Sequence, residues 1–94
     1  MTHLRSGARW KQMADKFKHR CKMANLPCHL CGQTIDYRAK QTPDSFEVDH
    51  YYPISERPDL VFNERWLRPS HARCNHQRGN KPIDELPWVP ANWP

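Results

Sequence analysis

The chain has 94 residues, of which 37% are hydrophobic, and its formal net charge is +5. A chain of this length buries little apolar surface, so we expect one small domain over residues 1–94 that is stabilised by disulfides or by a metal ion. No apolar run is long enough for a secretory signal or a membrane-spanning helix. This argues against a membrane partner and favours the cytoplasm, where cysteines stay reduced and bind metal.

The positive charge is concentrated in the first part of the chain. Residues 1–40 hold nine Lys and Arg against two Asp, a net +7, whereas residues 41–94 hold six against eight acidic residues, a net −2. A cationic segment of this kind is typical of proteins that bind a polyanion such as DNA. The alternative is a helix face that is only solvated.

The first predicted element is an amphipathic helix over residues 9–24. Its apolar side chains recur at helical spacing: Trp10, Met13, Phe17 and Cys21. Lysines and arginines occupy its other faces, so the helix can pack on the domain and present cations to a phosphate backbone. We expect Lys11, Lys18 and Lys22 to contact DNA, and Cys21 to be a core residue.

Two strands, a loop and a short second helix are predicted in the rest of the chain. Residues 34–37 and residues 46–52 have strand character, and the second range is rich in aromatic and branched residues. A loop is predicted over residues 53–64. Ser70 is the predicted N-cap of a short helix over residues 71–78, which a glycine ends.

Three cysteines and a histidine form two closely spaced pairs, Cys28-x-x-Cys31 and His71-x-x-Cys74. Sulfur and imidazole donors suit zinc, and four protein ligands make a structural site with no position for substrate. We therefore predict a structural Zn²⁺ in a Cys3His tetrahedron. His29, between the first two ligands, is expected to be exposed.

Asp49, His50 and Asn75 are the candidate hydrolytic residues. Hydrolysis of a phosphodiester needs a cation at the phosphate and a base for the attacking water. A carboxylate and an amide oxygen can hold Mg²⁺ or Mn²⁺, and a neutral imidazole can accept a proton. Because adjacent strand residues point to opposite faces, Asp49 and His50 share one site only if the chain leaves strand geometry near Pro53.

The order of these motifs resembles that of the HNH endonucleases, in particular the small, often phage-encoded members with a zinc knuckle. The matching segments lie between residues 28 and 81: Cys28-x-x-Cys31, Glu47-Val48-Asp49-His50-x-x-Pro53 and Leu67-Arg68-Pro69-Ser70-His71-x-x-Cys74-Asn75-x-x-Arg78-Gly79. The resemblance implies a small, zinc-stabilised α+β domain. Its treble-clef-like ββα-metal core would cover residues 28–81, after the basic helix over 9–24 and before an irregular tail over 87–94.

The resemblance also implies metal-dependent cleavage of DNA, by nicking or double-strand cutting, that leaves 5′-phosphate and 3′-hydroxyl ends. Asp49 and Asn75 would bind Mg²⁺, Mn²⁺ or another divalent cation, and His50 would be the general base. Phage members of the family often act beside the DNA-packaging motor, so packaging proteins such as terminase are candidate partners, in the cytoplasm of a bacterial host.

One position departs from the family's pattern. The family usually has an Asn before the Leu-x-Pro element, where it pins the loop behind the catalytic His, but this chain has Trp66. Either Asn63 takes over this loop-pinning role or Trp66 holds the loop by packing. Arg78 follows Asn75 by three residues and could clamp the scissile phosphate, or it is a solvated arginine.

The alternative function is a zinc-knuckle module that binds nucleic acid without cutting it, or an adaptor in a phage DNA-packaging assembly. A binding module needs the basic helix and the zinc site. It has no use for a carboxylate, an imidazole and an amide grouped around a cation, and this grouping favours the nuclease.

Overall fold

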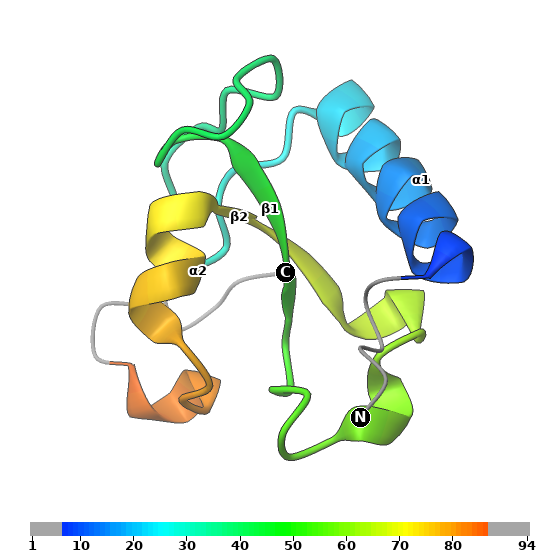
Figure 1. The fold of residues 1–94 in the computed structure, drawn as a ribbon. Helices are drawn as coiled ribbons and strands as arrows, with labels where there is room; N and C mark the ends of the chain where they lie inside the picture. The colour runs from blue at the N-terminus through cyan, green and yellow to red at the C-terminus, as the bar shows by residue number, and fades with distance from the viewer. Residues whose placement is uncertain (1–6, 87–94) are drawn as a thin grey trace.

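A two-stranded antiparallel sheet lies between two helices in the computed structural model, which describes residues 7–86 (Figure 1). The elements follow in the order α1 (Ala8–Ala24), β1 (Phe46–His50), β2 (Leu67–His71) and α2 (Ala72–Arg78). This arrangement confirms a small α+β fold. The predicted irregular tail over residues 87–94 lies outside the described residues.

Helix α1 agrees with the prediction to within one residue. It ends where Asn25 adopts a left-handed conformation, with φ of 52°, and its N–H bonds the carbonyls of Cys21 and Lys22. Phe17 and Cys21 are buried on its inner face. Cys21 is 1% exposed and belongs to the core, as expected.

The two strands pair with Phe46 opposite His71 and His50 opposite Leu67. β1 ends at His50 rather than at residue 52, because the chain bends at the next two residues. Along β1 the side chains alternate between the helices. Phe46 and His50 contact rings of α1, whereas Glu47 and Asp49 bond side chains of α2.

The second strand was not expected, because it contains Pro69 and Ser70 and has little strand character of its own. The prediction that Ser70 caps a helix is wrong. Its hydroxyl donates to the Glu47 carbonyl across the sheet, and α2 begins two residues later, at Ala72. Pairing with β1, rather than local preference, therefore decides the structure of this segment.

The predicted strand over residues 34–37 is also wrong. In the described part of the chain this range contributes one isolated bridge, between Asp36 and Ser45. The Asp36 carboxylate instead accepts a hydrogen bond from the Arg38 N–H and forms a turn. Aspartate side chains commonly compete in this way with regular backbone pairing.

The core lies between α1, the sheet and the loop that follows α1. Its buried members include Leu30, Ile35, Tyr37, Val48 and Leu67. The expected loop over residues 53–64 is irregular apart from short 3-10 turns at Pro58–Leu60 and Glu64–Trp66. Within residues 7–86, no helix combines the length and the apolar character needed to cross a bilayer.

Candidate functional site

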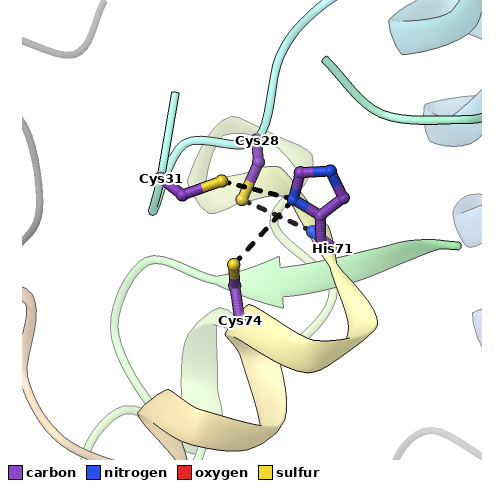
Figure 2. A group of neighbouring side chains, drawn as sticks. All are labelled: Cys28, Cys31, His71 and Cys74. Carbon is purple, nitrogen blue, oxygen red and sulfur yellow. Dashed lines mark hydrogen bonds between the residues drawn. The ribbon is translucent and has the colours of Figure 1, made fainter. Parts of the chain in front are cut away.

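The four predicted zinc ligands come together at one point, as Figure 2 shows. The ligand atoms of Cys28, Cys31, His71 and Cys74 all lie within 4.8 Å of one another. The first two come from the loop after α1, His71 ends β2, and Cys74 lies in the first turn of α2. The predicted Cys3His cluster is therefore confirmed, and it could hold a structural metal such as zinc.

The surroundings of the cluster fit a zinc ion. The Nε2 of His71 donates to the Thr34 carbonyl at 2.8 Å, so Nδ1 is the atom that faces the sulfurs, 3.3 Å from Cys31 Sγ. The backbone N–H groups of Leu30 and His71 donate to the Cys28 sulfur, each at 3.4 Å. Such outer hydrogen bonds orient ligands and stabilise thiolate charge.

Two of the three thiols are unfavourable places for a charge without a cation, whereas the pKa of Cys31 is lowered, against the effect of burial, by hydrogen bonds from the Gln33 N–H and the neighbouring thiols. Burial raises the pKa of the Cys74 thiol to about 12, and the nearby Cys28 and Cys31 sulfurs add to the shift. Burial likewise raises the pKa of Cys28. A cation is what allows the thiols to ionise together in this position, because metal binding displaces their protons.

The candidate hydrolytic residues border one cavity, of about 160 Å³, at the end of β1. Asp49, His50 and Asn75 all line it, together with Arg78 and the first residues after Tyr52. A cavity needs only about 15 Å³ to hold one water, so this one has room for several. The chain leaves strand geometry directly after His50, close to Pro53 as expected, and both Asp49 and His50 border the cavity although their side chains contact different helices.

His50 is held by contacts on two sides. Its Nε2 lies 3.1 Å from the Val61 carbonyl, and its ring stacks on Trp10 of α1 with centroids 5.2 Å apart. A carbonyl oxygen only accepts, so Nε2 carries the proton of this hydrogen bond. In the neutral ring the basic lone pair is then on Nδ1. The imidazole is 6% exposed.

Glu47 orients Asn75, a role that the sequence analysis did not assign. The Asn75 Nδ2 donates to Glu47 Oε1 at 2.6 Å, which makes Oδ1 the end of the amide that can bind a cation. Glu47 precedes Asp49 by two residues on β1. The period of two along a strand was the signal that could have placed both residues against α2.

Arg78 and His29 hold Asp49, and both differ from expectation. Asp49 Oδ2 accepts from Arg78 Nη1 and pairs with His29 Nε2, each at 2.6 Å. His29 is 1% exposed rather than solvated. Its partner lies 20 residues away, so no local pattern in the sequence reveals this contact.

The predicted phosphate clamp at Arg78 is not what the structure shows. The guanidinium is 1% exposed and also donates to the carbonyls of His50, Tyr51 and Lys81. Its hydrogen bonds therefore go to the protein. The reason is the buried carboxylate of Asp49, which needs a cationic partner when it is removed from water.

The two candidates for pinning the loop behind His50 make different contacts. Asn63 Oδ1 accepts from the Arg65 N–H at 3.1 Å and caps the 3-10 turn Glu64–Trp66. The Trp66 ring packs against Tyr51, with centroids 5.9 Å apart, and its carbonyl accepts from the Tyr51 N–H. Asn63 thus fixes its own turn, whereas Trp66 contacts Tyr51, the residue that follows His50.

The three lysines expected to contact DNA lie on one stripe of α1, because they are spaced by seven and four residues. Lys11 is exposed and pairs with Asp15 at 2.8 Å. Lys18 lies partly over the Phe46 ring, and Lys22 is exposed in the last turn.

Comparisons with known proteins give one informative similarity. No family model and no solved structure matches the chain. The Septu protein PtuB of Bacillus thuringiensis is 34% identical to it over 68 residues, which are 72% of this chain and 25% of PtuB. The chain thus spans about a quarter of the length of this curated relative.

Proposed function

We propose that the protein is a metal-dependent DNA endonuclease of the HNH type. The observation that carries the proposal is the cavity that Asp49, His50 and Asn75 border together, with the His50 imidazole held in one orientation. Its Nε2–H is donated to the Val61 carbonyl, so Nδ1 is the basic nitrogen. A ring fixed in this way is suited to take a proton from water.

The reaction uses this nitrogen as a general base. Nδ1 of His50 takes a proton from water as the water oxygen forms a bond to phosphorus. The bond from phosphorus to the 3′ oxygen breaks, and the leaving oxygen takes a proton from solvent. The products carry a 5′-phosphate and a 3′-hydroxyl.

Asp49 and Asn75 would hold the divalent cation, Mg²⁺ or Mn²⁺. Both bonds to the Asp49 carboxylate use Oδ2, so Oδ1 is the oxygen that would bind the ion, and Asn75 would supply its own Oδ1. When bound, the cation would supply positive charge at the phosphate and the leaving oxygen. Arg78 balances the charge of Asp49, so the site does not repel an anionic backbone.

The sheet and α2 support the assignment to a ββα-metal core. β1 carries Asp49 and His50, β2 leads directly into α2, and α2 carries Asn75. The Cys3His cluster fixes the start of α2 and therefore the position of Asn75, which follows Cys74. The cationic stripe of α1 provides a surface for the DNA backbone.

The test is nicking of supercoiled plasmid by the zinc-loaded protein with Mn²⁺ or Mg²⁺. We expect relaxed plasmid from the wild type, and a loss of at least about a hundredfold in rate for His50→Ala, as for removal of a general base. His19→Ala, which removes an exposed imidazole from α1, serves as the control and keeps full activity.

A second candidate is a nucleic-acid-binding module that does not cut. One observation favours it, because Asp49 already has two close partners in His29 and Arg78. An inert wild type that binds duplex DNA, across a panel of divalent cations, would establish this function and reject the nuclease.

A further inference from the structure

We propose that His29 is a positioning residue that fixes the carboxylate of Asp49 for cation binding and so couples the zinc knuckle to the hydrolytic site. This inference rests on the proposed function in one respect, namely that Asp49 binds a divalent cation. It adds a residue that lies outside the hydrolytic set and acts through Asp49.

His29 is fixed by the two cysteines that flank it in the knuckle. Cys28 precedes it, and Cys31 follows two residues later, so metal binding at these thiols immobilises the short loop that carries it. Its backbone N–H donates to the Pro69 carbonyl of β2 at 2.9 Å. The imidazole is 1% exposed and therefore cannot leave Asp49 without opening the domain.

The contact with Asp49 is short and directional. His29 Nε2 lies 2.6 Å from Asp49 Oδ2, and an ionised carboxylate only accepts, so Nε2–H is the donor. Arg78 donates to the same oxygen from α2, also at 2.6 Å. One oxygen held from two directions prevents rotation of the carboxylate, and this determines where Oδ1 lies.

The two partners of Asp49 make different contributions. Arg78 supplies the positive charge that a buried carboxylate needs, and its own position is set by carbonyls of residues 50, 51 and 81. His29 supplies a second hydrogen bond, which reaches Asp49 from the zinc knuckle instead of from α2. Loss of His29 therefore leaves the charge of Asp49 balanced and affects the placement of Oδ1.

The experiment measures Mn²⁺ binding to zinc-loaded protein by electron paramagnetic resonance, which needs no turnover. His29→Phe keeps a buried ring and removes the donor. Because outer hydrogen bonds to metal ligands contribute about ten- to a hundredfold in affinity, we expect Mn²⁺ to bind at least about tenfold more weakly, with zinc content unchanged. His19→Phe, on the exposed surface of α1, is the matched control and binds Mn²⁺ as the wild type does.

A second variant shows whether His29 acts through Asp49. Asp49→Asn removes the carboxylate, and adding His29→Phe to it is expected to weaken Mn²⁺ binding no further. An unchanged Mn²⁺ affinity in folded, zinc-loaded His29→Phe overturns the proposal, as does a full additional loss in the double variant. Normal Mn²⁺ binding without nicking would instead reject the nuclease and leave the role of His29 supported.

Wild-type protein provides the test if His29→Phe does not fold. Nitrogen-15 NMR of its imidazoles is expected to show His29 protonated at Nε2, with a resonance that shifts as Mg²⁺ saturates the site. A resonance that stays unchanged at saturating Mg²⁺ contradicts the proposal.

Discussion

At the scale of single residues, the least expected feature is the buried Arg78. Long cationic side chains are rarely buried unless they are paired, and this one bonds Asp49 and three backbone carbonyls. It joins α2 to the end of β1, the place where the candidate hydrolytic residues lie. Arg78 is therefore a structural residue of the site rather than a ligand for phosphate.

Replacement of Arg78 by alanine should be strongly destabilising. The change leaves a buried carboxylate without its cationic partner, which costs about 3–5 kcal/mol. Urea denaturation of the zinc-loaded protein measures the loss. Arg57→Ala, which breaks an exposed pair with Asp59, should cost no more than about 1 kcal/mol. Equal effects of the two changes would contradict the structural role.

Cys21 is the one cysteine of the described residues that lies outside the Cys3His cluster. Burial raises the pKa of its thiol to about 11, so at pH 8 about one molecule in a thousand carries the reactive thiolate. We expect iodoacetamide to leave Cys21 unmodified in native protein at this pH, as read by mass spectrometry of its peptides. Rapid labelling of Cys21 before unfolding would show that α1 opens easily.

At the scale of elements, the sequence predicted correctly the features that depend on residues close together in the chain. The periodic apolar residues of α1 gave its bounds, and the paired cysteines gave the metal cluster, because both signals lie within a few residues. β2 was missed because Pro69 and Ser70 do not favour a strand and only pairing with β1 makes them one. The contacts of His29 and Arg78 were missed for a similar reason, since their partner Asp49 lies 20 and 29 residues away.

The cationic stripe of α1 leads to a prediction about how the affinity for DNA depends on salt concentration. Each lysine that neutralises a phosphate contributes about 0.9 to the slope of log affinity against log salt concentration on duplex DNA. Replacing Lys11, Lys18 and Lys22 by glutamine should therefore reduce the slope by about 2 to 3. Lys16→Gln, on the other side of the helix, should leave it unchanged. A triple variant with the wild-type slope would place the DNA elsewhere.

At the scale of the whole molecule, the Cys3His cluster brings together segments that lie far apart in the chain. Cys28 and Cys74 lie 46 residues apart, and their cluster connects the loop after α1 to the junction of β2 and α2. Structural zinc contributes about 10–16 kcal/mol in small domains, whereas net stability is about 5–15 kcal/mol. The metal contribution is thus as large as the whole stability of such a domain.

Removal of the metal should therefore unfold the protein rather than only loosen one loop. We expect an excess of a zinc chelator to abolish the cooperative thermal transition in circular dichroism, and added Zn²⁺ to restore it.

Co²⁺ in place of zinc should give the thiolate charge-transfer and d–d bands of a tetrahedral Cys3His site, and Cys74→Ser should weaken them. Because His29 lies within the knuckle and bonds Asp49, the proposed Mn²⁺ site should be lost from the chelated protein as well. A chelated protein that keeps both its thermal transition and its Mn²⁺ binding would show that the core holds these segments together without the metal.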